Sequence, residues 1–194
     1  MNHIYTTKAI IVKSIPIGEA NKYYFLLTED LGFIRASAQG VRLDKSKLKG
    51  HLQDFCLVSI SLVKGKEVWR IVGVETLESE SFLKNTNKLV AIKNIFNLLT
   101  RLLHGEEKNE ALYQSIESSY NFLLKNELSQ DNVKNLETIT VLRVLYHLGY
   151  FKTSFDLLDF VKDNELSVEV LNLFDTNKKL AILDINSALQ ESHL

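Results

Sequence analysis

The chain has 194 residues, of which 45% are hydrophobic and 24% charged, with 23 Lys and Arg against 24 Asp and Glu. This length and composition fit one or two globular domains and exclude a disordered or collagen-like chain. A single cysteine excludes an internal disulfide framework and any Cys-rich zinc site, and no apolar run is long enough to span a membrane.

Turn-forming residues are concentrated in the first 75 residues, which hold six of the eight glycines and the only proline. Turns at short intervals are typical of an all-β segment. Apolar alternation predicts five strands there, over 8–15, 23–28, 33–38, 58–62 and 67–74. Five strands in so short a segment are typical of a small Greek-key barrel such as an OB-fold.

Strand alternation also predicts which side chains face the interior. Cys56 shares the parity of Val58, so we expect a small core residue rather than a nucleophile. Tyr24 has the opposite parity to Tyr23 and Phe25, so one face of this strand exposes an aromatic side chain. Bases could stack on such a ring, although most barrel aromatics are expected in the core.

The remainder of the chain shows helical periodicity. Hydrophobic residues recur at helical spacing over 89–103, 112–123 and 136–148, and shorter helices are predicted near 153–163, 168–174 and 179–190. Gly149 follows the third helix at the position of a C′ glycine. The fold class is therefore α+β, with a five-stranded OB-fold barrel over 1–79 followed by an all-α helical domain over 80–194.

The near-neutral total charge conceals two oppositely charged segments. Residues 1–75 hold 11 basic and 7 acidic residues, a net charge of +4, whereas residues 76–194 hold 12 and 17, a net charge of −5. A basic barrel suits a polyanionic partner, and an acidic helical segment is better suited to protein contacts.

The positive charge is densest between positions 35 and 50, where only Asp44 opposes five cations. These cations are Arg35, Arg42, Lys45, Lys47 and Lys49. The cations at 45, 47 and 49 would share one side of an extended segment, and such a row suits the phosphates of a nucleic acid. The alternative is a solvated loop whose lysines only keep the chain soluble.

Motifs for catalysis or metal binding are missing from the sequence. It has no Walker A pattern, no HExxH and no paired-cysteine motif, and its five histidines are far apart. We therefore expect no metal, no cofactor and no enzymatic activity, because nothing indicates a pocket with convergent titratable groups.

Several stretches, taken together in order and spacing, resemble the RecO family of bacterial recombination mediators. They are Ala9–Ser14, Pro16–Lys22, Leu26–Gly32, Ala38–Arg42, Lys45–Leu48, Leu52–Phe55 and Leu142–Tyr150. Asp54 stands where the family usually has a proline, and the chain lacks the four cysteines that hold zinc in many relatives.

The resemblance implies a non-enzymatic role in DNA repair and recombination. The expected activities are binding single- and double-stranded DNA, annealing complementary strands, and helping to load RecA onto strands coated by single-stranded-DNA-binding protein (SSB). The expected protein partners are RecR, the acidic C-terminal tail of SSB and, indirectly, RecA. The implied location is cytoplasmic and nucleoid-associated, without membrane contact.

The six residues predicted to contact phosphates are Lys22, Arg35, Arg42, Lys45, Lys47 and Lys49. Arg143, alone or with Arg101, is predicted to lie at the edge of an apolar groove that takes the SSB tail. The alternative for both arginines is salt bridges within or between helices. The rival class for the whole protein is an OB-like adaptor that binds proteins and no nucleic acid, in which the cations would scatter over the surface.

Overall fold

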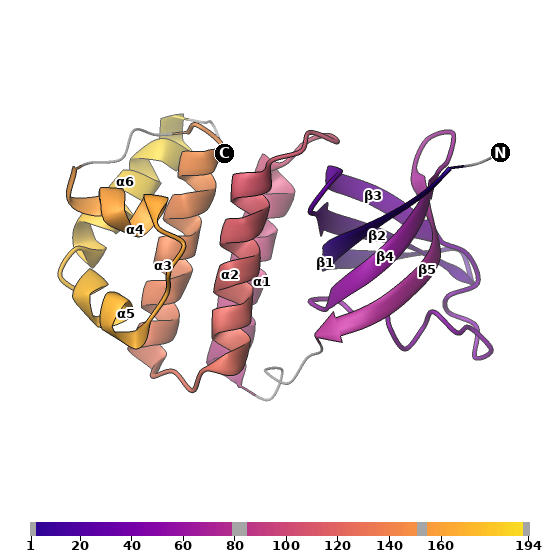
Figure 1. Cartoon of the computed structure of the whole chain (residues 1–194), viewed down its shortest axis with the longest axis horizontal. Coiled ribbons are helices and arrows are strands. Elements are labelled where there is room, and N and C mark those ends of the chain that lie inside the picture. Colours follow the sequence, from indigo (N-terminus) through magenta and orange to yellow (C-terminus); the bar gives the residue numbers. More distant parts are fainter. Residues whose placement is uncertain (1–2, 79–84, 151–154, 192–194) are drawn as a thin grey trace. The chain divides into compact units, whose positions relative to one another are not determined.

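The computed structural model describes residues 3–78, 85–150 and 155–191, and the chain forms two compact units. One unit comprises Met1–Glu80 and Leu103–Glu110, and the other comprises Ser81–Leu102 and Ala111–Leu194. Figure 1 shows the strands in the first unit and the helices in the second. The predicted boundary between residues 79 and 80 lies outside the described residues.

The first unit is a closed barrel of five strands in the order β1-β2-β3-β5-β4. The strands are β1 (Ile4–Ile17), β2 (Asn21–Thr28), β3 (Gly32–Ala38), β4 (Leu57–Lys64) and β5 (Trp69–Glu78). All neighbours pair antiparallel except β3 and β5, which pair in parallel. The predicted five-stranded OB-fold barrel is confirmed.

Closure of the barrel depends on β1 and on a short pairing between β3 and β5. β1 is long enough to pair with β4 along its first half and with β2 along its second, and a register shift between Ile11 and Lys13 bends it. On the opposite side, Ala36 pairs with Trp69 and Ser37 with Arg70. The Ser37 hydroxyl also donates to the Trp69 carbonyl at 3.3 Å.

The barrel interior is filled by the side chains that strand alternation predicts. Cys56 is 2% exposed and packs with Val58, which confirms its expected core position, and Tyr24 is 1% exposed. The other large members of this core are Ile11, Leu26, Ile34, Leu52, Ile60, Leu62, Trp69 and Ile71.

The segment between β3 and β4 is not extended. Its backbone forms successive turns, in which Leu43 donates to Gly40, Ser46 to Leu43 and Lys49 to Ser46. The expectation that the cations at 45, 47 and 49 share one side of an extended segment is therefore wrong. Bonds between residues three apart replace the two-residue alternation on which that expectation depended.

The barrel unit includes the segment Leu103–Glu110, which follows α1 in the chain. The Glu106 carboxylate accepts from Trp69 Nε1 at 2.9 Å and from Lys64 Nζ at 3.1 Å. Lys108 forms an ion pair with Asp30 at 3.3 Å. These contacts hold the segment against the barrel.

The second unit is helical, as predicted, and the described part contains α1 (Thr86–Leu102), α2 (Glu110–Lys125), α3 (Gln130–His147), the 3-10 turn η2 (Phe155–Leu157), α4 (Leu158–Lys162), α5 (Val168–Phe174) and α6 (Lys178–Glu191). Gly149, at φ +75°, ends α3. Its N–H donates to Tyr146 and the N–H of Tyr150 to Leu145, which is the Schellman pattern expected of a C′ glycine.

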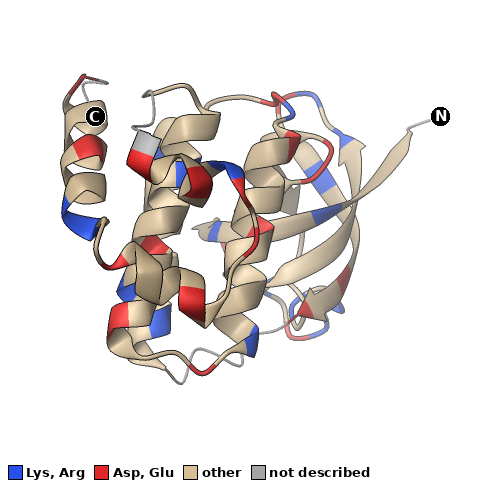
Figure 2. Cartoon of the chain, turned by 60° about the vertical axis from the view of Figure 1, so that its left-hand side comes forward, with Lys and Arg blue, Asp and Glu red and all other residues tan. Residues whose placement is uncertain are grey.

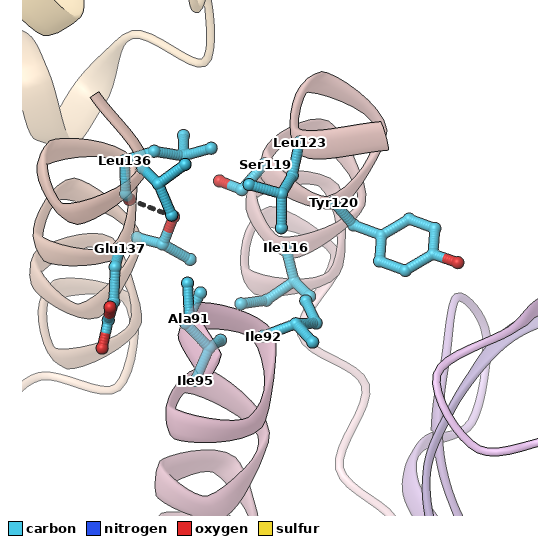
Figure 3. Close-up of a pocket in the computed structure, with 11 residues that line it drawn as sticks. Ala91, Ile92, Ile95, Ile116, Ser119, Tyr120, Leu123, Leu136 and Glu137 are labelled. Carbon is cyan, nitrogen blue, oxygen red and sulfur yellow. Dashed lines mark hydrogen bonds between the residues drawn. The ribbon is translucent and has the colours of Figure 1, made fainter. Parts of the chain in front are cut away.

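The three long helices pack through aliphatic side chains. Figure 3 shows Ile92 and Ile95 of α1 facing Ile116 of α2, with Leu136 of α3 on the far side. The gap between them has a volume of about 10 Å³. That volume holds about one water molecule, so this gap belongs to the core and is too small for a ligand.

We predict that Gly32→Ala loosens the Leu103–Glu110 segment. Gly32 has φ +71°, and a Cβ built there would lie 2.2 Å from the Glu107 carbonyl oxygen. The left-handed backbone costs a non-glycine residue about 1–2 kcal/mol, and the clash adds to that cost. Hydrogen exchange of 103–110 should accelerate, and the free energy of unfolding should fall.

The matched control is Gly18→Ala. Gly18 also has a positive φ, +54°, but a Cβ there meets nothing within 4 Å. This variant should show only the backbone cost of about 1–2 kcal/mol, with normal exchange of 103–110. Equal exchange in both variants would contradict the close packing of Gly32 on this segment.

Candidate nucleic-acid interface

Three of the six predicted phosphate-binding residues line one pocket at the end of the barrel. Lys22, Arg42 and Lys49 surround a volume of about 300 Å³. The remaining lining residues are Tyr24, Val41, Leu52 and Gln53. We call this site the basic pocket. Its size lies at the lower end of the range typical of small-molecule sites.

Non-local hydrogen bonds bring these cations together. Arg42 is fixed by the loop between β1 and β2, because its N–H donates to Ala20 at 2.9 Å and its Nη1 to the Gly18 carbonyl at 2.6 Å. Lys22 is the second residue of β2 and lies on the side of Tyr24, with Nζ 6.0 Å from that ring and 3.4 Å from the Ser14 hydroxyl. The pocket therefore lies between the start of β2 and the turns after β3.

Lys49 is the cation of the pocket whose present partner is easily replaced by a phosphate. Its Nζ lies 3.1 Å from the Asp44 carboxylate, and the two side chains are 51% and 100% exposed. An ion pair this exposed contributes about 0–1 kcal/mol, so a phosphate could replace Asp44 at little cost.

Tyr24 lines the basic pocket from the barrel core, where its side chain is almost fully buried. Burial, followed by the nearby charge of Asp54, raises the pKa of Tyr24 to about 12. The hydroxyl is therefore protonated at neutral pH and presents no negative charge to an anion. The three cations of the pocket form a surface that favours phosphate.

The other three predicted residues lie outside the basic pocket. Lys45 and Lys47 are exposed on the turns, and no hydrogen bond or ion pair of theirs is found within the described part of the chain. Arg35 is exposed on the outer side of β3, where its guanidinium lies 5.0 Å from the centre of the Tyr23 ring. It lines a separate groove with Phe25 and Phe33.

The apolar residues that line the basic pocket and the groove beside Arg35 were not predicted from the sequence. Strand parity could have indicated the outward Phe33 and Arg35, which are two residues apart on β3. No local signal could have indicated His104 as a groove residue, because it follows α1, far from β2 and β3 in the sequence.

The two predicted protein-contact residues occupy different environments. Arg101 is exposed in the last turn of α1. Arg143 is 1% exposed, and its guanidinium donates to the carbonyls of Phe160, at 2.8 Å, and Asp163, at the end of α4. Burial lowers the pKa of Arg143 to about 10, partly opposed by Asp163, so it stays charged at neutral pH.

Two roles were considered for Arg143 from the sequence, at the edge of a groove or in a salt bridge. Its hydrogen bonds to backbone carbonyls correspond to neither role. A cation that binds the last carbonyls of a helix acts as a C-terminal cap. A partner could reach the guanidinium only if residues 160–163 moved, so the contact of Arg143 with a partner stays a prediction. No described pocket is lined by both arginines.

Charges of both signs are distributed over strands, loops and helices (Figure 2). The described residues contain no group of three or more His, Cys, Asp or Glu that could hold a metal ion. Nor is any helix in the described ranges long and apolar enough to cross a membrane.

We predict that Arg143→Ala destabilises the helical unit by about 2–4 kcal/mol, because it leaves buried carbonyls at the end of α4 without donors. The matched control, Arg101→Ala, should change stability by no more than about 0.5 kcal/mol, since Arg101 is exposed. Urea unfolding measures both values. Similar stabilities for the two variants would contradict the capping role of Arg143.

Comparisons with known proteins show which family the barrel resembles. Residues 1–80 match the family model described as "Recombination protein O N terminal". Proteins named "DNA repair protein RecO" are similar over a longer stretch. The one from Dehalococcoides mccartyi is 36% identical over 118 residues, which cover 60% of this chain and 47% of that protein.

Two further relatives carry the same name. The Gloeothece citriformis protein is 33% identical over 59% of this chain and 41% of its own length, and the Clostridium novyi protein is 30% identical over 76% and 57%. Among solved structures, an asparaginyl-tRNA synthetase of Entamoeba histolytica aligns with 78% of this chain and 34% of that chain, at 12% identity and a TM-score of 0.35, which is too low to indicate a shared fold.

The chain spans about half the length of the curated relatives it matches. The matched region includes the whole barrel and both depressions described above, apart from the wall that 103–106 supplies. The resemblance stated from the sequence is thereby confirmed: residues 1–80, which contain the barrel, match the N-terminal model of the RecO family.

Proposed function

We propose that this protein acts in DNA repair and recombination by binding DNA through phosphate contacts at the basic pocket, without catalysing a reaction. The observation that carries the proposal is the convergence of Lys22, Arg42 and Lys49 around one depression of the barrel. Phosphate contacts give affinity and orientation without reading sequence. The exposed Lys45 and Lys47 extend the positive surface beside the pocket-forming turns.

This binding mode suits the annealing of complementary strands. Cations that neutralise phosphates reduce the repulsion between two strands, and they leave the base edges free to pair. The same contacts would form on single and double strands, because both display phosphates. The match of the barrel to the RecO N-terminal model supports this role.

The resemblance further supports RecR, the SSB tail and, indirectly, RecA as partners of this chain, together with a cytoplasmic, nucleoid-associated location. The rival, an OB-like adaptor that binds proteins and no nucleic acid, differs in one measurable property. An adaptor has no salt-dependent affinity for DNA, whereas the proposed function requires it.

We predict that the double variant Lys22→Gln/Lys49→Gln weakens single-strand binding and flattens its salt dependence. Each lost phosphate contact should reduce the slope of log affinity against log salt concentration by about 0.7 on single strands. Arg42 is left in place because it also anchors the loop between β1 and β2 through Gly18. Fluorescence anisotropy with a labelled oligonucleotide, repeated over a range of salt concentrations, gives both quantities.

The matched control is Lys93→Gln/Lys134→Gln, which removes the same charge from exposed positions on α1 and α3. Its slope should equal that of the wild type. If the pocket variant keeps the wild-type affinity and salt slope, the basic pocket does not bind DNA. A wild-type protein without DNA affinity would leave the adaptor as the function.

We also predict that the wild-type protein accelerates the annealing of complementary strands coated with SSB. Acceleration should fall as salt concentration rises, because the phosphate contacts weaken. Fluorescence quenching between labelled strands measures the rate. An unchanged annealing rate at low salt would contradict the annealing role, even if DNA binding is observed.

A further inference from the structure

A row of aromatic rings and one cation lies on the outer side of β2 and β3, away from the basic pocket. Its members are Tyr23, Phe25, Phe33 and Arg35, and we call it the ring face. Tyr23 and Phe25 are half-buried, Phe33 is 9% exposed and Arg35 is exposed.

Strand register creates this row. Phe25 pairs with Arg35, and Tyr23 and Phe33 are the diagonal neighbours on either side. The Phe25 and Phe33 rings lie 6.3 Å apart with an angle of 30° between their planes, and Arg35 lies 5.0 Å from the Tyr23 ring centre. Stacking of this kind is what diagonal pairs on a twisted sheet allow for large side chains.

Phe25, Phe33 and Arg35 of the ring face form one side of a groove of about 420 Å³, and residues 103–106 form another. Glu67 and Val68 also line this groove. That second wall is held in place by the bonds from Trp69 and Lys64 to the Glu106 carboxylate. The carboxylate is thereby occupied with two donors, which reduces its repulsion of a nucleic acid. His104 is exposed at the same wall.

We infer that this groove binds unstacked bases of single-stranded DNA, with Phe25 as the stacking ring and Arg35 contacting the adjacent phosphate. A base has an apolar face that fits an aromatic ring, and stacking tolerates every sequence. Arg35 beside the ring supplies the positive charge for that phosphate. The groove also carries the exposed Glu67, so the phosphate is expected on the Arg35 side.

The inference rests on the proposed function and extends it. Phosphate contacts at the basic pocket are available to single and double strands alike, whereas bases inside a duplex are stacked on each other and cannot lie on a protein ring. The ring face therefore gives the protein a preference for single strands. Pairing of the bound bases would withdraw them from the groove, so the annealed product is held less tightly than its separate strands.

The test compares an oligothymidylate with a strand of equal length in which abasic residues replace the nucleosides. Both strands carry the same phosphates, so their affinity ratio reports on base contacts alone. The wild-type protein should bind the oligothymidylate roughly 10-fold more tightly than the abasic strand. Phe25→Leu should reduce the ratio to about 1–2 while keeping the affinity for the abasic strand. Phe25→Tyr, which retains the ring, should keep the wild-type ratio.

Tyr5→Leu is the matched control, because Tyr5 is a 40%-exposed aromatic of β1 that lies outside the groove. It should leave the ratio unchanged, and the salt slope should be the same in all these proteins, since no charge is altered. Circular dichroism confirms that each variant is folded.

A wild-type ratio near one, or a Phe25→Leu variant that keeps the wild-type ratio, would overturn the inference. If the strands bind equally and with the normal salt slope, the ring face fails while the phosphate contacts remain. If neither strand binds, the proposed function itself fails.

Discussion

One tryptophan joins the closure of the barrel to the segment that completes its outer groove. Trp69 pairs with Ala36 across the short parallel contact that closes the sheet, and its ring is 3% exposed in the barrel core. Its indole N–H donates to Glu106, and Lys64 lies 5.2 Å from the ring centre while binding the same carboxylate. A single side chain thus fills the interior, borders the closing pair and anchors a segment distant in sequence.

The alternation of β2 separates the two sites that we propose contact a nucleic acid. Lys22 and Tyr24 share the parity of the barrel interior and reach the basic pocket at its end. Tyr23 and Phe25 have the opposite parity and form part of the ring face. Because the strand is fixed on both sides by its neighbours, the two sets keep a constant separation. A strand bound through its phosphates at one set could present bases to the other.

Local patterns predicted most of the secondary structure, because alternation and helical periodicity report directly on burial. Cys56 and Gly149 behaved as expected for the same reason. The grouping of Arg42 with Lys22 depends on a backbone bond to Ala20, and such long-range partners leave no local signal. Arg143 was equally unpredictable, since its polarity indicated a surface position and the carbonyls that offset its burial lie on a later helix.

The barrel unit is discontinuous in sequence, because Leu103–Glu110 belongs to it while the intervening residues belong to the helical unit. Synthesis proceeds from the N-terminus, so all five strands leave the ribosome before Glu106 does. Until then the indole N–H of Trp69 lacks its acceptor and the outer groove lacks a wall. A nascent or truncated chain that ends at residue 80 contains all five strands of the barrel. It lacks the 103–110 segment, which supplies the acceptor for Trp69 and one wall of the groove. Completion of the barrel is therefore coupled to the synthesis of α1.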